Sequence, residues 1–430
     1  MSKTLRTLLA LAGVFALLAA LVAWLNLRDE DPLTGAAPAS SPDLIARGAY
    51  LARAGNCMGC HTERGGAEYA GGRGVPTPFG TIYAPNLTPD PNHGLGAWTG
   101  AEFWRALHNG RARDGRLLYP AFPYPNYTRV TRADADAIFA FLRSLPPVAQ
   151  PNRAHTLQFP FDRQAALAVW RALYFRPARP DPDPSRDTEW NRGAYLVEGL
   201  GHCNACHASR NALGATAGPL DLAGGLIPVQ NWYAPSLAST REAGVADWSD
   251  AHVIELLKTG VSARGAVMGP MSEVVSGSTQ HLSEPDLRAM ARYLKALQAP
   301  GGDTAPAPEA SAASTATTAL DTPGARLYER HCAACHGKSG EGVAGVYPAL
   351  ARSRAVMMAT PANLVHMVLE GGFPPATTGN PRPYGMPPFA TVLSNDEVAQ
   401  LLTHVRASWG NRAEGVSALD VTRYRAVAPR

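Results

Sequence analysis

Six cysteines occur in this chain of 430 residues, and they all belong to three copies of one short motif. The motif is C-x-x-C-H, the attachment signature of c-type haem. Two thiols at this spacing add to the two vinyl groups of a haem, and the adjacent histidine is held against the iron as its proximal ligand. The sequence therefore predicts three covalent haem c groups. Their attachment residues are Cys57, Cys60 and His61; Cys203, Cys206 and His207; and Cys332, Cys335 and His336.

Other uses of paired cysteines explain the pattern less well. A zinc site built from C-x-x-C pairs needs four converging ligands and does not require a histidine after every second cysteine. A thioredoxin-like redox motif comes singly on a βαβ unit. A disulfide framework would leave the three histidines unexplained.

An electron-carrying haem takes a second protein ligand, commonly methionine, which raises its reduction potential. The third repeat offers Met386 in Gly-Met-Pro-Pro-Phe, and the second offers Met268 or Met271 in Met-Gly-Pro-Met. Counted from the glycine expected to end the preceding helix, Met271 matches the spacing of Met386 better. We therefore expect iron ligation by Met271 and Met386, with Met268 as a core residue.

The first repeat departs from this pattern. Phe122 stands where the methionine is expected, and a phenyl ring cannot bind iron. Its haem then takes another ligand, for which His93 and His108 are candidates, or it keeps an open iron site. An open site leaves a peroxidase-like haem enzyme as an alternative, for which His93, His108 and Arg113 are the only hints of distal acid–base groups.

Each proximal histidine needs an acceptor that orients its Nδ1–H group. In the third repeat, the carbonyl of Pro348 lies 12 residues beyond His336 and is a candidate. Pro85 and Pro235 are the parallel candidates in the first and second repeats, at larger spacing.

The first cysteines of successive motifs are 146 and 129 residues apart, a spacing that predicts tandem domains with separate cores. Each repeat opens with a helix carrying a small residue and then an aromatic one, as in Arg-Gly-Ala-Tyr50, which suits close helix packing. Middle helices should end at Gly110, Gly260 and Gly371. Closing helices should begin after Thr131, Ser283 and Ser394, which resemble capping boxes.

Residues 7–27 carry no charge and span about 31 Å as a helix, enough to cross a bilayer. Lys3 and Arg6 precede this run and acidic residues follow it, so the positive-inside rule places the remaining chain outside the cytoplasm. A cleaved signal peptide is the alternative, but no clean A-x-A site follows the run. We expect an anchor in the bacterial inner membrane, with the haem domains on the periplasmic side.

The composition indicates a folded protein and argues against nucleic-acid binding. The chain is 46% hydrophobic and 17% charged, with a net charge of +4, so it can form packed cores and shows no basic stripe for nucleic acid. Aromatic residues between 159 and 175 predict a helix packed on the first domain, or a surface for a partner subunit or the bilayer. The segment at 299–318 consists almost entirely of Ala, Pro, Gly, Ser and Thr, which predicts a flexible tether. Such a tether would let the third domain move between an electron donor and an electron acceptor.

In each repeat the order of helix, C-x-x-C-H, loops, middle helix, methionine loop and closing helix resembles the class I cytochrome c fold. Residues from about 40 to 410 resemble the tri-haem cytochrome c subunits of bacterial membrane-bound dehydrogenases of the alcohol, aldehyde or gluconate type. The segments that carry this resemblance are 77–90, 119–127, 190–197 and 278–282. Members of the alcohol-dehydrogenase type have methionine where this chain has Phe122.

The resemblance implies an all-α, loop-rich fold of three class I cytochrome c domains behind the N-terminal helix. It also implies an electron-transfer subunit without substrate turnover of its own. Electrons would come from a catalytic partner, which is a quinoprotein, flavoprotein or molybdenum hydroxylase, and pass to membrane quinone or another carrier. A cytochrome subunit of a terminal oxidase remains an alternative. The expected parts are an anchor or signal segment at 7–27, cytochrome c domains at 42–148, 186–298 and 321–411, an aromatic helix and Pro-rich linker at 149–185, and a flexible linker at 299–320.

Overall fold

The computed structural model describes residues 2–28, 30, 33, 38–178, 181–218, 221–297 and 322–425. It divides into two compact units, which are described separately here. The first unit is formed by residues 1–52, 60–181 and 212–215, and the second by residues 53–59, 182–211 and 216–430. The expected tether at 299–318 lies outside the described residues.

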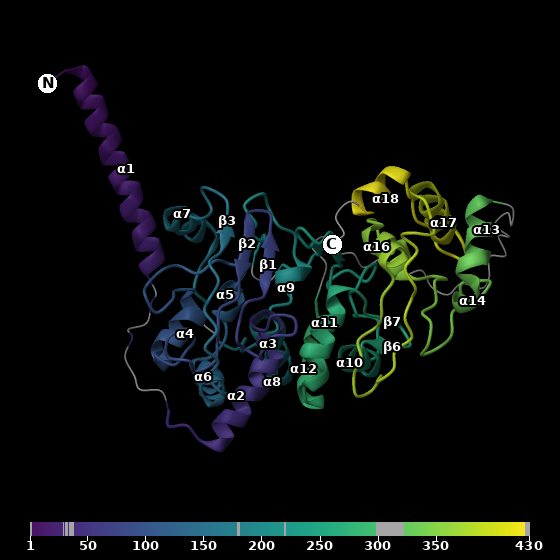
Figure 1. Cartoon of the computed structure of the whole chain (residues 1–430), viewed down its shortest axis with the longest axis horizontal. Coiled ribbons are helices and arrows are strands. Elements are labelled where there is room, and N and C mark those ends of the chain that lie inside the picture. The colour runs from purple at the N-terminus through teal and green to yellow at the C-terminus, as the bar shows by residue number, and fades with distance from the viewer. Residues whose placement is uncertain are drawn as a thin grey trace. The chain divides into compact units, whose positions relative to one another are not determined.

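The elements are mainly helices separated by long loops (Figure 1). The helices of the chain up to the second motif are α1 (Lys3–Leu27), α2 (Pro42–Ala54), α3 (Cys57–His61), α4 (Gly100–Asn109), α5 (Tyr124–Tyr127), α6 (Arg132–Ser144), α7 (Gln164–Tyr174), α8 (Thr188–Ala194), the π-helix η1 (Tyr195–Leu200) and α9 (Asn204–His207). Those that follow are α10 (Asp250–Thr259), α11 (Pro270–Gly277), the 3₁₀ helix η2 (Thr279–His281), α12 (Glu284–Lys295), α13 (Pro323–His331), α14 (Ala333–His336), α15 (Arg354–Met357), α16 (Ala362–Glu370), α17 (Asn395–Ala407) and α18 (Ala418–Arg425).

Short antiparallel strands interrupt the loops, a feature that the sequence patterns did not predict. The first unit has a sheet in the order β1-β2-β3, and the second unit has two hairpins, β4-β5 and β6-β7. Their bounds are β1 (Gly74–Thr77), β2 (Gly80–Tyr83), β3 (Thr156–Leu157), β4 (Gly225–Leu226), β5 (Tyr233–Ala234), β6 (Val261–Ser262) and β7 (Gly265–Ala266). Strands of two to four residues are too short to carry an alternating apolar pattern, so the packing elements are helices, as the all-α prediction has it.

One helix crossing is repeated three times along the chain. The opening helices α2, α8 and α13 each place a glycine against the closing helices α6, α12 and α17. A Cβ atom on Gly48, Gly193 or Gly324 would lie 1.9, 2.0 or 2.2 Å from the carbonyl oxygen of Ala137, Ala289 or Gln400, respectively. No side chain fits there, so glycine is what allows the backbones to approach. The close packing predicted for the small residue in each opening helix is thus confirmed.

The predicted helix ends are also confirmed. Gly110, Gly260 and Gly371 cap the middle helices α4, α10 and α16, all with positive φ. The hydroxyls of Thr131, Ser283 and Ser394 accept hydrogen bonds from the third residue of α6, α12 and α17. Only the last forms a reciprocal capping box, because glutamate rather than aspartate follows it.

Within the second unit, the segment around the second motif contacts the segment around the third. The side-chain amide of Asn363 donates to the carbonyl of Tyr233 and accepts from its N–H group, both at 2.8 Å. The ring of Trp232 stacks on that of buried His366, with centroids 4.8 Å apart. These contacts favour a docked third segment over one that swings on a tether.

The glycine crossing gives a direct test of the repeated fold. Replacing Gly193 by valine should lower the apparent free energy of unfolding of the second unit by about 2 kcal/mol or more, because α8 and α12 must separate. Denaturant unfolding followed by circular dichroism measures it. Gly218→Ala is the matched control, since its added Cβ would meet no atom within 4 Å. Equal stability of the two variants would contradict the predicted crossing.

Candidate functional site

Each C-x-x-C-H motif forms a short helix, α3, α9 or α14, at the end of an opening helix. Residues three and four apart lie on the same side of a helical turn, so the two sulfur atoms and the imidazole of one motif share a face. The six cysteines are free thiols rather than disulfides. This arrangement is the one that attachment to two vinyl groups and one iron requires.

The three proximal histidines are oriented in the same way. The Nδ1–H groups of His61, His207 and His336 donate to proline carbonyls at distances of 2.8, 2.7 and 2.9 Å. The acceptors are the three carbonyls expected from the sequence, those of Pro85, Pro235 and Pro348. With Nδ1 protonated and engaged, the free lone pair of each ring is on Nε2, which is where a metal would bind.

The environment keeps these rings neutral. Burial lowers the pKa of His61, of His207 and of His336, while the hydrogen bond to proline opposes that effect in each case. A neutral imidazole at neutral pH is the form that ligates a metal. Burial and the hydrogen bond to proline thus leave Nε2 of the proximal histidine neutral and unprotonated in all three copies.

A glycine supports each histidine–proline pair, and the sequence patterns did not identify it. The N–H groups of Gly71, Gly224 and Gly342 donate to the carbonyls of the three proximal histidines at 2.8 to 2.9 Å. All three glycines have positive φ, between 65° and 84°. A Cβ at Gly71 or Gly342 would lie 2.6 or 2.8 Å from the carbonyl carbon of the acceptor proline. The sequence does not reveal these glycines because each follows its histidine at a different sequence separation in the three copies.

Different side chains fix the three proline loops. The amide of Asn86 donates to the Val148 carbonyl at 2.8 Å, directly after Pro85. In the second copy, Glu242 accepts from the N–H group of Ser236 at 2.6 Å. In the third, Asn411 donates to the Leu350 carbonyl at 2.9 Å. The position of the carbonyl is therefore repeated, while the means of holding it is not.

These donor sets fit haem better than zinc. Burial raises the pKa of Cys203 to about 12 and that of Cys332 to about 11, which favours the thiol over the thiolate that zinc binds. Among the described residues, no group of three or more His, Cys, Asp or Glu side chains is placed to hold a metal ion. One imidazole beside two separate thiols suits a porphyrin iron, whose other equatorial ligands come from the macrocycle.

Met386 packs against the hydrophobic core of the third segment. Its N–H and carbonyl groups form a two-hydrogen-bond bridge to Gly372, just beyond the end of α16, at 2.8 and 2.9 Å. Its side chain is partly buried against the same hydrophobic core as Cys332 and Phe389. The structure therefore brings the predicted methionine ligand and the attachment cysteine to one core.

Backbone register relates Met271 to Phe122. The N–H group of Leu118 donates to the carbonyl of Gly110, and that of Val267 to the carbonyl of Gly260, both at 2.8 Å. Four residues beyond these matched positions lie Phe122 and Met271, whereas Met268 matches Tyr119. The register thus matches Met271, rather than Met268, to Phe122 of the first repeat, and iron ligation by Met271 stays a prediction.

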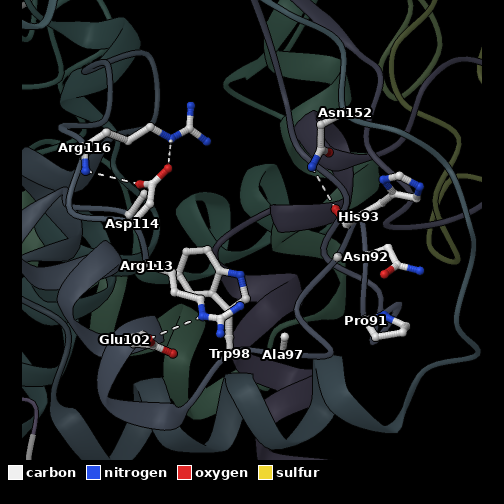
Figure 2. Close-up of a pocket in the computed structure, with 12 residues that line it drawn as sticks. Pro91, Asn92, His93, Ala97, Trp98, Glu102, Arg113, Asp114, Arg116 and Asn152 are labelled. Carbon is white, nitrogen blue, oxygen red and sulfur yellow. Dashed lines mark hydrogen bonds and ion pairs between the residues drawn. The ribbon is translucent and has the colours of Figure 1, made fainter.

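The three hints of acid–base chemistry do not come together at the first motif. His93 and Arg113 line one surface pocket of about 450 Å³, together with Trp98, Glu102 and Asn152 (Figure 2). Neither the first attachment motif nor Phe122 is among the residues lining it. In this pocket Asn152 donates to the His93 carbonyl at 2.7 Å, and Arg113 pairs with Glu102 at 3.5 Å. The pocket gives the peroxidase hypothesis no support.

His108 has a packing role in the structure. It lies buried on α4, and its ring stacks on Trp104 with centroids 4.5 Å apart. Stacking of this kind is what a core histidine at the end of an amphipathic helix commonly does. Iron ligation by His108 stays a prediction.

Family comparisons agree with this geometry. Residues 45–146 match the family described as cytochrome c, and residues 319–405 match the family of subunit III of cbb3-type cytochrome c oxidase. The fold and the motifs therefore define a c-type cytochrome with covalently bound haem c.

Individual relatives define the class of cytochrome more closely. The chain is 41% identical over 411 residues to the cytochrome c subunit of alcohol dehydrogenase (quinone) from Gluconacetobacter polyoxogenes, covering 91% of this chain and 87% of that protein. It is 37% identical to the gluconate 2-dehydrogenase cytochrome c subunit from Pantoea cypripedii, covering 89% of each. It is also 41% identical to a nicotinate dehydrogenase subunit from Pseudomonas putida, over 92% of this chain but 33% of that protein. The chain belongs to the family of dehydrogenase cytochrome c subunits, which transfer electrons and are not the catalytic subunits.

The role expected of Met386 can be tested on the full-length protein. Met386→His should remove one methionine-to-iron charge-transfer band and lower one reduction potential by on the order of 100 mV, since histidine stabilises the oxidised iron more than methionine does. Redox titration followed by near-infrared absorption measures both. Met367→Leu, which changes a neighbouring methionine on α16, should alter neither. An unchanged band in Met386→His would remove this residue from the ligand set.

The register between Phe122 and Met271 predicts that a methionine at position 122 would add an iron ligand at the first motif. Phe122→Met should raise the total methionine-to-iron band by about half, because a third methionine-ligated haem would join the two expected at the other motifs. Phe159→Met serves as the control, since that side chain is 78% exposed. No increase in Phe122→Met would mean that another residue already holds the sixth position of that iron.

Proposed function

We propose that this protein carries electrons from a periplasmic dehydrogenase subunit to membrane quinone through three covalently bound haem c groups. The observation that carries the proposal is the hydrogen bond from a proximal histidine to a proline carbonyl, which occurs in all three motifs at 2.7 to 2.9 Å. Three equivalent donor sets on one chain suit a relay better than a single reaction centre.

The expected haem ligands belong to these three sites. His61, His207 and His336 would hold the three haem irons, and Met271 and Met386 would complete the second and third sites. A bound haem supplies a one-electron iron couple, and the chain itself sets the potential through these axial ligands and their burial. The cysteine pairs fix each haem, and the proline carbonyls keep each imidazole in one tautomer. Phe122 leaves the first site different from the other two.

The N-terminal helix α1 anchors the chain in the inner membrane, with the haem domains on the periplasmic side. It has 25 residues, a mean hydropathy of 2.6 over its most apolar window, and almost entirely exposed side chains. A signal sequence would pass the same test of length and composition. The anchor is favoured because the last turn of the helix is hydrogen-bonded to the first unit, which a cleaved segment would not need.

The catalytic partner is a dehydrogenase subunit, since relatives over nine-tenths of the chain are named as cytochrome c subunits of such enzymes. Three of these relatives carry quinone in their names, which supports quinone as the acceptor. The match to an oxidase subunit covers the third segment alone, so a terminal-oxidase role has less support. The contacts of Asn363 with Tyr233 favour transfer between docked second and third haem segments.

Purification from native membranes tests the proposal. We expect tagged full-length chain, solubilised in mild detergent, to co-purify with the catalytic subunit of a dehydrogenase. Adding that subunit's substrate should reduce the haems, and adding a short-chain ubiquinone should then reoxidise them, as followed by haem absorption. The variant Met386→His is the matched comparison, because a lowered potential should slow one of these steps.

Two results would overturn it. One is recovery of a copper oxidase, rather than a dehydrogenase, as the stable partner. The other is a set of haems that stays oxidised when substrate is added to a complex whose catalytic subunit is active with an artificial dye.

A further inference from the structure

Helix α7 in the first unit is apolar on its exposed side as well as on its buried side. Its sequence, QAALAVWRALY, has one charged residue, Arg171, and that residue is buried. The exposed side includes Ala165, Val169 and Leu173, which recur every four residues and so form one stripe. Val169 is 47% exposed and Leu173 is 60% exposed. A helix on an aqueous surface normally presents its polar face outward and its apolar face inward.

Arg171 is buried because it holds α7 to the end of α1. Its Nε–H group donates to the side-chain oxygen of Asn26 at 2.9 Å. The amide of Asn26 in turn donates to the carbonyl of Ala168 on α7 at 2.9 Å. Asn26 is the one buried residue of α1. Both hydrogen bonds that the Asn26 side chain makes to a distant segment therefore go to α7. Figure 1 shows α7 next to the C-terminal end of α1.

Further contacts add to this junction. The guanidinium of Arg171 lies over the rings of Tyr124 and Phe175, at 5.0 and 4.8 Å. Arg111, next to the cap of α4, donates to the backbone carbonyl of Asn26 and pairs with Glu30 at 2.6 Å. Charged groups that are largely shielded from water thus hold the last turn of α1 to the rest of the first unit.

The position of Asn26 sets the depth of α7 in a membrane. The uncharged run from residue 7 to Leu25 measures about 29 Å as a helix, which is the thickness of the hydrocarbon core. Asn26 and its partner α7 then lie at the interface between hydrocarbon and headgroups. Trp24, Trp170 and Tyr174 lie in or beside this junction, and tryptophan and tyrosine are enriched at that level of a bilayer.

We propose that the exposed stripe of α7 lies in the interfacial layer of the lipid bilayer, so that the chain holds the membrane with two elements joined by the Asn26–Arg171 contact. This inference rests on the proposed anchoring of α1. The occupant of the stripe is lipid because the stripe continues from the membrane-spanning helix and carries no charge that a soluble partner would pair with. Phe159, 78% exposed, is apolar as well and precedes α7.

Photocrosslinking on the full-length chain tests the proposal. Leu173 is replaced by p-benzoyl-phenylalanine, and the protein is illuminated in native membranes and in nanodiscs of phosphatidylethanolamine and phosphatidylglycerol. The same group at Leu419, which is 69% exposed on α18, is the control. We expect phospholipid adducts at position 173 to exceed those at position 419 several-fold. Equal yields, or adducts at position 173 mainly with another protein subunit, would overturn it.

Variants of α1 test the junction itself. Asn26→Leu removes both hydrogen bonds to α7 and should reduce the lipid adducts at position 173 by several-fold, while haem absorption shows that the domains are folded. Thr7→Val, which changes an exposed hydroxyl near the start of α1, should leave the yield unchanged. An undiminished yield in Asn26→Leu would contradict a role for this contact.

Alkaline washing separates this inference from the proposed anchoring. If the unmodified chain is released by alkaline carbonate, the anchor fails and the inference fails with it. If the chain stays in the membrane but gives no excess of lipid adducts at position 173, only the inference is overturned.

Discussion

The hydrogen bond between a proximal imidazole and a proline carbonyl is the constraint around which each repeat is arranged. To place that carbonyl, the chain must turn back on the attachment helix after a loop of variable length. A glycine with positive φ makes the turn possible, because its N–H group binds the histidine carbonyl and a side chain there would collide with the proline loop. One atom, Nε2, is thereby left free and neutral in all three copies, as an axial ligand must be.

A close backbone contact also positions the helices around each site. An opening helix that carries the motif must cross its closing helix closely, and a glycine at the crossing leaves room for one backbone against the other. Two other features differ between the three copies. The side chains that hold the proline loops differ, and Phe122 stands in the first repeat where the second and third offer the expected methionine. With haem bound at each site, these differences would allow the three reduction potentials to differ.

Much of this could be predicted from the sequence, and the reasons for the rest are physical. C-x-x-C-H, the capping residues and the helix-ending glycines act locally, so the sequence indicated them directly. Pro85, Pro235 and Pro348 were candidate acceptors at unequal spacing, and the structure confirms all three. Gly71, Gly224 and Gly342 escaped notice because their role depends on a distant loop folding back. Arg171 escaped for the same reason, since a lone arginine in an apolar helix shows its purpose only when Asn26 is beside it. Short strands arise from backbone pairing between loops and leave no periodic pattern.

The most direct test of the central claim is the intact mass of the denatured full-length protein, made in a host that attaches c-type haem. Thioether bonds survive denaturation, whereas ligands held only by coordination do not. The account predicts the mass of the polypeptide plus three haem groups, with the residues of α1 retained. The mass of the bare polypeptide, or of a chain with fewer than three haems, would contradict it.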